Sequence, residues 1–171
     1  MDAMNDKARD IFIVGLRSQH AVENQAIELL ERQVGRLQNY PEMSERMRQH
    51  IEESKQQARR IEGILSGLGT SHSTLKDAAM SFTGNLMAIG HSTATDEVIK
   101  NTFANYAFEH YEIAAYKSLL VLADSVSAAG RPALEASLKE ELAMADWIEK
   151  HIGTTTLRYV ERTAAGLTAG I

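Results

Sequence analysis

The chain has 171 residues, with 44% hydrophobic and 24% charged side chains, two prolines and no cysteine. This length favours one domain with a substantial core, and the composition is typical of a mainly helical protein. The absence of cysteine excludes disulfides, thiolate zinc sites, iron–sulfur clusters and thiol nucleophiles, so any metal would need oxygen and imidazole ligands. The 23 acidic and 18 basic residues give a net charge of −5 without a basic stripe, which argues against nucleic acid as a partner.

The N-terminal sequence carries acidic residues where a secretory signal would be basic, and its apolar run is short and soon interrupted. We therefore expect no export signal and no membrane span, and a cytoplasmic location. We expect a single domain over residues 1–171, with a core bundle over about 7–152 and a tail over 153–171.

The first long helix is predicted over about residues 7–38. Steps of three and four residues give the seam Ile13, Leu16, His20, Glu23, Ile27, Leu30, Val34 and Leu37. This seam is apolar at both ends and polar in the middle. A buried Glu and His one turn apart need compensation by a partner charge, a hydrogen-bond network or a metal ion.

The second helix is predicted over about 42–66, because Pro41 disfavours helical geometry at Tyr40 and fits the first turn of a new helix. Its seam is again polar in the middle, at His50, with Glu53 beside it. A shorter third helix, over about 75–89, would carry the chain back along the bundle as a crossover.

The fourth helix is predicted over about 96–128, with Glu109 and Glu112 at its centre. Gly130 and Pro132 indicate a stop and a restart, and the last long helix, over about 132–151, has Glu141 near the middle of its seam. After Gly153 we expect a short helix that docks on the body or on a subunit partner. The predicted fold is all-α, a four-helix bundle of up-down-down-up order with a crossover.

Each long helix thus places a carboxylate at mid-seam, and in such a bundle the four side chains would converge in an apolar interior. They are Glu23, Glu53, Glu112 and Glu141, with His20, His50 and Glu109 each three residues before one of them. Uncompensated carboxylates would repel one another and take up protons. Two divalent cations would neutralise the cluster, and this mixture of oxygen and nitrogen ligands suits iron or manganese.

The main alternative is that the carboxylates form buried salt bridges with Arg17, Lys55 or Lys117. His110 follows Glu109 directly and so points about 100° away, towards a supporting position or an interface. A phosphorelay histidine would have to face solvent, whereas His20 and His50 are predicted to face inward.

The sequence resembles the bacterial YciE/YciF proteins of the ferritin-like superfamily. The resemblance is carried by AVENQ at 21–25, HIEES at 50–54, KDAAM at 76–80, EHYEIAAY at 109–116 and the pair Glu140-Glu141. It implies a ferritin-like four-helix bundle with a fifth helix, a homodimer, a di-iron-type site and a link to stress responses. The His-x-x-Glu order at 20–23 and 50–53 reverses the Glu-x-x-His pairs that are usual in the wider superfamily.

Three hypotheses follow. In the first, two metal ions, iron or manganese, are bound by Glu23, His50, Glu53, Glu109, Glu112 and Glu141, with His20 and His110 as lesser candidates. Bound Fe(II) would then react with O₂ or peroxide. In the second, the chain is a non-catalytic structural or interaction bundle, dimeric, with a vestigial or single-ion site. The third, iron storage in a hollow shell, requires a large assembly.

Overall fold

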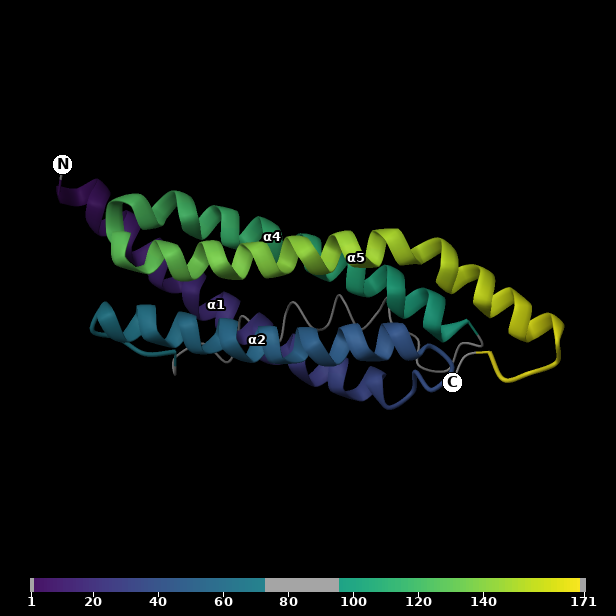
Figure 1. Ribbon diagram of the computed structural model, residues 1–171. Helices are drawn as coiled ribbons and strands as arrows, with labels where there is room; N and C mark the ends of the chain where they lie inside the picture. The colour runs from purple at the N-terminus through teal and green to yellow at the C-terminus, as the bar shows by residue number, and fades with distance from the viewer. Residues whose placement is uncertain (1, 73–95, 170–171) are drawn as a thin grey trace.

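The computed structural model describes residues 2–72 and 96–169, which form a bundle of four long helices (Figure 1). These are α1 (Asp2–Val34), α2 (Pro41–Gly67), α4 (Glu97–Val126) and α5 (Arg131–Ala164), with a short 3-10 helix, η1 (Ala128–Gly130), before α5. In Figure 1, α1 and α5 run in one direction and α2 and α4 in the other, which confirms the up-down-down-up order. The predicted crossover helix lies outside the described residues. No helix in these two stretches is long and apolar enough to cross a membrane.

The connection between α1 and α2 begins earlier than predicted. The helix ends at Val34, whereas the sequence suggested a stop near Asn39. Glycine at position 35 is a weak helix former, and beyond it the backbone bonds span three residues, as in Leu37 N to Val34 O at 3.2 Å. Pro41 then occupies the first turn of α2, as predicted.

Two glycines lie where helices approach each other closely, near one end of the bundle. A Cβ atom on Gly15 would lie 3.0 Å from Cδ2 of Leu119, and one on Gly130 would lie 3.1 Å from Cγ1 of Ile64. A larger residue at either position would force these side chains to shift, so glycine suits the present spacing of α1 against α4 and of η1 against α2.

The apolar core is divided into two clusters, one towards each end of the bundle. The first, the N-terminal cluster, includes Phe12, Leu16, Ile61, Leu65, Leu119 and Leu134. The second, the corner cluster, includes Leu30, Met43, Met47, Val98, Met144 and Ile148. Because each cluster contains residues of all four helices, the residues between the two clusters lie at one height along the bundle (Figure 1). That height is where the predicted polar residues lie.

The C-terminal helix is longer than predicted. It was expected to end near residue 151, but α5 continues to Ala164, through Gly153. One glycine in a helix costs only about 1 kcal/mol, which the backbone hydrogen bonds of the next three turns offset. The helix ends instead before Gly166, whose φ of 68° suits glycine.

Residues after Gly166 turn back onto the bundle, so the predicted docking of the tail on the body is observed although the predicted helix boundary was wrong. The hydroxyl of Tyr40 donates to Ala169 O at 2.7 Å, and Nδ2 of Asn39 donates to Thr168 O at 3.1 Å. Arg162 Nε also donates to Thr168 O, at 2.8 Å. The end of the chain is thereby tied to the α1–α2 connection (Figure 1).

Candidate metal centre

A belt of buried polar side chains crosses the bundle between the two apolar clusters. We call it the buried belt, and its members are Gln19 and Glu23 of α1, His50, Glu53, Ser54 and Gln57 of α2, Glu109, Glu112 and Tyr116 of α4, and Glu141 of α5. All except Glu53 are at most 2% exposed. The sequence-based prediction that the mid-seam carboxylates face the interior therefore matches their positions in the structure.

His50 is the centre of one half of the buried belt. Its Nδ1 lies 2.8 Å from Glu53 Oε2, and its Nε2 lies 3.2 Å from Glu109 Oε2 and 3.7 Å from Glu141 Oε2. Ligand atoms of His50, Glu109 and Glu141 all lie within 4.8 Å of one another, so these three residues could hold a metal ion. The imidazole on α2 thus faces carboxylates from α4 and α5.

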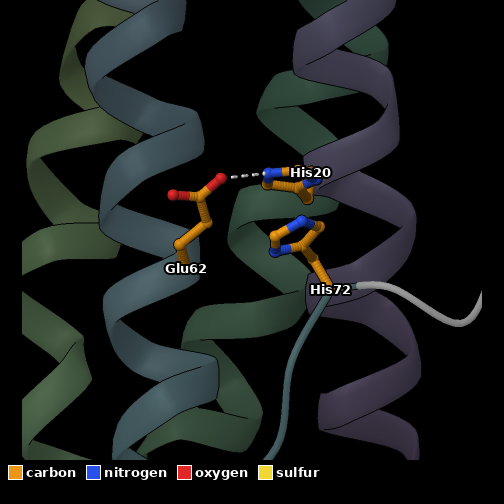
Figure 2. Close-up of side chains that lie close together, drawn as sticks. All are labelled: His20, Glu62 and His72. Carbon is orange, nitrogen blue, oxygen red and sulfur yellow. Dashed lines mark hydrogen bonds and ion pairs between the residues drawn. The ribbon is translucent and has the colours of Figure 1, made fainter.

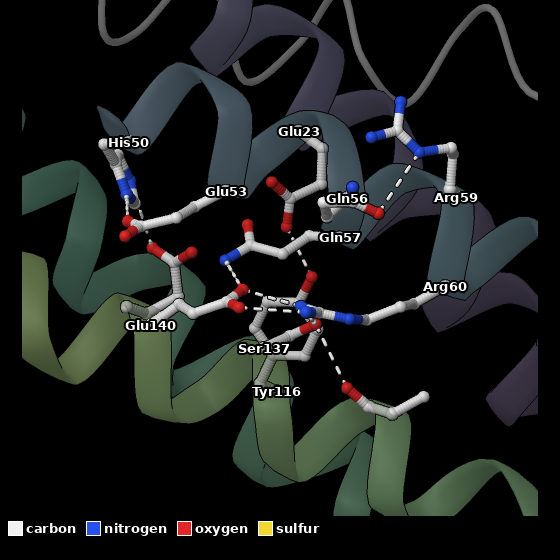
Figure 3. Close-up of polar contacts among 12 residues, drawn as sticks. Glu23, His50, Glu53, Gln56, Gln57, Arg59, Arg60, Tyr116, Ser137 and Glu140 are labelled. Carbon is white, nitrogen blue, oxygen red and sulfur yellow. Dashed lines mark hydrogen bonds and ion pairs between the residues drawn. The ribbon is translucent and has the colours of Figure 1, made fainter. Parts of the chain in front are cut away.

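The other half of the belt joins α1 to α4. The amide of Gln19 donates to Glu23 Oε1 at 2.9 Å and to Glu112 Oε1 at 3.1 Å. The hydroxyl of Tyr116 also donates to Glu23 Oε1, as Figure 3 shows. One oxygen of each carboxylate is therefore oriented by neutral donors, which leaves the other oxygen free to bind elsewhere.

Three carboxyl groups of the belt, those of Glu23, Glu112 and Glu141, hold protons unusually strongly. Burial raises the pKa of Glu23 to about 7, against the lowering effect of the hydrogen bond from Tyr116. Burial also raises the pKa of Glu112 and of Glu141 well above the usual range, and the nearby charge of Glu141 or Glu109, respectively, adds to the effect. In the absence of a cation, part of the belt is protonated at neutral pH.

Burial alone would lower the pKa of His50, but the adjacent Glu109 carboxylate outweighs it and the pKa rises well above the usual value. Within the described residues, the His50 imidazole is the positively charged group that lies against Glu109 and Glu141, whereas Arg46 pairs with Glu53 at the wall of the bundle. A single such charge faces Glu109 and Glu141, with Glu23 and Glu112 beyond them.

Several buried oxygen atoms have no hydrogen-bond partner within the described residues. Among the carboxylates they are Oε2 of Glu23, Glu109 and Glu112 and both oxygens of Glu141, and among the neutral groups they are oxygens of Gln19, Ser54 and Gln57. A buried polar atom without a partner costs about 1–3 kcal/mol, and such atoms in a native fold call for a water or an ion. Carboxylate oxygens together with an imidazole nitrogen form a donor set that suits iron or manganese. The residues present therefore fit the metal that the sequence predicted.

The cations proposed as alternative partners lie elsewhere. Arg17 donates to Thr70 and Ser71, Lys55 pairs with the surface carboxylates of Glu31 and Glu52, and Lys117 is exposed. Within the two described stretches, the predicted buried salt bridges to these three residues are not formed.

Glu53 differs from the other predicted ligands because it lies at the wall of the bundle. Its side chain is 19% exposed and also accepts from Arg46 at 3.0 Å. Burial would raise the pKa of Glu53, but the bonds from His50 and Arg46 lower it. A carboxylate on the far nitrogen of an imidazole is a common way to orient a metal-binding histidine.

The two lesser candidates lie away from the belt. His20 Nε2 bonds Glu62 Oε1 at 2.8 Å, on the side of the bundle. The ring of His110 is exposed and meets Tyr106 edge-on at 4.5 Å between centroids. The structure does not bring either one together with His50, Glu109 and Glu141.

Two polar members of the site were not singled out from the sequence. Gln19 lies four residues before Glu23 and so shares its face, a spacing that could have revealed it. Gln57 donates to Glu140 Oε2 at 3.0 Å, and Arg60 binds both oxygens of Glu140, at 2.6 and 2.9 Å (Figure 3). Glu140 is therefore neutralised outside the belt, whereas its neighbour Glu141 is not.

Comparison with known proteins gives consistent matches over most of the chain. Residues 7–161 match the profile of the family "Domain of unknown function (DUF892)". A crystal structure of a protein from Xanthomonas campestris pv. campestris is 31% identical and superposes with a TM-score of 0.75, over 92% of this chain and 99% of that one.

The Escherichia coli stress protein YciF is 25% identical, with a TM-score of 0.73 over 85% of this chain and 94% of that chain. YcfI from Rhodopseudomonas palustris is 24% identical, with a TM-score of 0.73 over 83% and 92% of the two chains, and shares the fold. These matches confirm the resemblance that the sequence motifs indicated.

Proposed function

The chain belongs to the DUF892 family, and we propose that it is a carboxylate-bridged metal-binding protein whose buried belt holds two divalent ions. Iron is the best fit and manganese the next, given the oxygen and imidazole donors. The observation that carries this proposal is the set of buried carboxylate oxygens without partners, contributed by α1, α4 and α5. Two divalent ions would satisfy these oxygens and neutralise their charge together.

In this proposal the ligands are Glu23, His50, Glu53, Glu109, Glu112 and Glu141. His50, Glu109 and Glu141 would hold one ion, since their donor atoms already lie within 4.8 Å of one another. Glu23 and Glu112 would hold the other through their Oε2 atoms, with their Oε1 atoms fixed by Gln19. Glu53 either binds an ion or orients the His50 ring through Nδ1.

Bound ferrous ions would supply electrons to O₂ or to a peroxide. The apolar clusters on either side of the belt exclude bulk water. The Gln19 amide and the Tyr116 hydroxyl donate hydrogen bonds that fix the position of Glu23 Oε1. The phenol of Tyr116, hydrogen-bonded to Glu23, lies where it could pass a proton to that carboxylate. Handling of iron or peroxide under stress, in the cytoplasm, would agree with the description of its relative YciF as a stress protein.

The decisive experiment is elemental analysis of untagged protein purified without chelator from iron- and manganese-supplemented cells. Glu141→Gln removes a charge inside the belt, and Glu140→Gln removes one from the adjacent residue, which pairs with Arg60. We expect about two ions per chain in the wild type and in Glu140→Gln, and a large loss in Glu141→Gln and Glu112→Ala. Oxygen consumption after addition of Fe(II) would follow.

Metal well below one ion per chain, and unchanged by these substitutions, would contradict the proposal. The second hypothesis, a non-catalytic bundle, would then stand. Protonation of the carboxyl groups and the hydrogen bonds from Gln19 and Tyr116 would then stabilise the belt without a metal ion. One ion per chain that is lost in Glu141→Gln but kept in Glu112→Ala would restrict the site to the His50 half.

We also propose that the protein forms a homodimer. Large apolar side chains remain exposed on the outer face of α4, among them Phe103 at 51% and Val121 at 74%. Such residues are more often found where a second copy covers them. Light scattering should give the mass of two chains, and a much larger assembly would instead revive the iron-storage shell.

A further inference from the structure

A second group of metal-binding side chains lies on the side of the bundle, apart from the buried belt. It consists of His20 on α1, Glu62 on α2 and His72, which follows the end of α2 (Figure 2). His20 Nε2 lies 2.8 Å from Glu62 Oε1, and the ring of His72 stacks on that of His20 with 4.5 Å between centroids. One donor atom from each of the three lies within 4.8 Å of the others.

The fold holds His72 in this position. Gly69 adopts a φ of 72°, which turns the chain at the end of α2 towards α1. Arg17 of α1 then donates to Thr70 Oγ1 at 2.6 Å and to Ser71 O at 2.8 Å, directly before His72. The stacking of the two rings therefore rests on a turn and two anchoring hydrogen bonds.

The chemistry of the group favours a cation. The two stacked imidazoles each carry ring nitrogens that can bind a metal ion. Glu62 adds a carboxylate that is 43% exposed, and the His20 ring is 12% exposed, so an ion from solvent can reach both. Two imidazoles and one carboxylate form a known three-residue set for Zn²⁺, with water as the fourth ligand.

We propose that His20, Glu62 and His72 bind one divalent ion of the zinc type, independently of the buried belt. Zinc bonds of about 2.0–2.1 Å place neighbouring ligand atoms roughly 3.3 Å apart in a tetrahedron, so the group must close by about 1 Å. His72 is exposed and lies outside any helix, so its side chain can make that movement. The ion would link α1, α2 and the segment that leaves α2.

The test uses the full chain, stripped of metal, in a Glu112→Ala, Glu141→Gln background, which removes one proposed ligand from each half of the belt. Zinc chloride is titrated by calorimetry, and cobalt chloride is added separately because four-coordinate Co²⁺ absorbs visible light far more strongly than six-coordinate Co²⁺. We expect one equivalent of Zn²⁺ to bind. His72→Ala or Glu62→Gln should weaken that binding at least about tenfold, as even loss of an outer partner does.

Matched controls are His110→Ala, which removes another exposed imidazole, and Glu45→Gln, which removes another exposed carboxylate of α2. Both should bind zinc as the parent does. Far-ultraviolet circular dichroism of the His72→Ala protein checks that its fold is intact.

The proposal is overturned if the parent binds no zinc, or if its binding survives both His72→Ala and Glu62→Gln. This test is independent of the proposed function. The belt is tested by comparing the iron content of the wild type with that of Glu141→Gln, whereas the His72 variants report only on zinc binding by the second group.

Discussion

Two sets of buried polar side chains connect α1 to α4, and they differ in how completely their hydrogen bonds are satisfied. Near the corner cluster, Gln33 and Asn105 exchange two hydrogen bonds, at 2.8 and 3.3 Å, and satisfy each other. In the belt, Gln19 bridges Glu23 and Glu112, but the outer oxygens of both carboxylates lack partners. Both sets are almost fully buried.

The difference shows that this bundle can fully satisfy buried polar side chains where they serve stability alone. The two amides of a neutral pair bond each other and need no ligand, water or ion. The belt instead gathers carboxylates at a cost in desolvation and repulsion that a hydrophobic replacement would avoid. The cation that we propose for the belt would account for polar groups that are satisfied at one level of the bundle and unsatisfied at another.

The largest expected effect comes from removing metal. Iron-loaded protein treated with a chelator should lose about 4 kcal/mol of stability if the ion was present at a thousand times its dissociation constant. For a chain of this length that is a fall in melting temperature of roughly 10 °C, measured by calorimetry. The Glu141→Gln protein should melt at the same temperature with and without chelator. An equal fall in the melting temperatures of the wild type and of Glu141→Gln would show that the metal is not bound in the belt.

The next effect is the pH dependence of the metal-free protein. Between about pH 4.5 and pH 7 the Glu23 carboxyl is protonated in the fold and ionised in the unfolded chain, so the native state binds more protons. Stability should therefore fall as pH rises through this range, by about 3 kcal/mol from Glu23. The raised pKa of His50 continues the fall at higher pH, because its proton too is held more tightly in the fold.

Urea unfolding at pH 5 and pH 8 measures this change, and the Glu23→Gln protein should show a smaller fall. The metal-loaded protein should lose less stability with pH, since the cation takes the place of the protons. A metal-free protein that became more stable as pH rose from 5 to 8 would refute this description of the belt.

A third prediction concerns the amide pair. Asn105→Ala leaves the buried Gln33 amide without a partner and should cost about 1–3 kcal/mol of unfolding free energy, equally with and without metal. Replacing both residues by leucine should cost less than the single change, because no polar group is then left unsatisfied. Chemical denaturation of the three proteins makes the comparison, and metal content should be the same in all.

The smallest expected effect is that of Tyr116→Phe, which removes one donor from Glu23 and keeps the ring in the core. We expect a loss of about 1 kcal/mol and an unchanged number of bound ions. The metal-free protein should also ionise Glu23 at higher pH, because the bond from Tyr116 lowers that pKa. Loss of metal in this variant would assign Tyr116 a direct part in binding.

The height of the belt could be predicted from the sequence because two simple rules determine it. Apolar residues at three- and four-residue spacing identify the buried face of each helix, and the Pro41 and Gly130 boundaries place consecutive helices side by side. His50 and Glu141 therefore had to meet near the middle of the bundle.

Other features depend on contacts that no local pattern encodes. The helix continued through Gly153 because the cost of one glycine is small, while the left-handed residue that ends it lies 13 positions later, at Gly166. No local pattern marks His72, because its approach to His20 depends on a turn at Gly69 and on Arg17 from another helix. Gln19 was missed because a neutral side chain in a seam gives no electrostatic signal.

The division of the core into two apolar clusters also determines the direction from which the belt can be supplied. Both ends of the bundle interior are filled by side chains, so a hydrated ion cannot travel along the axis. Of the six predicted ligands, Glu53 is the one with an appreciable surface, at 19% exposure. A metal ion bound in the belt, as we propose, would therefore enter sideways through the wall formed by α2 beside Arg46, and it would lose its hydration water there before it reached His50.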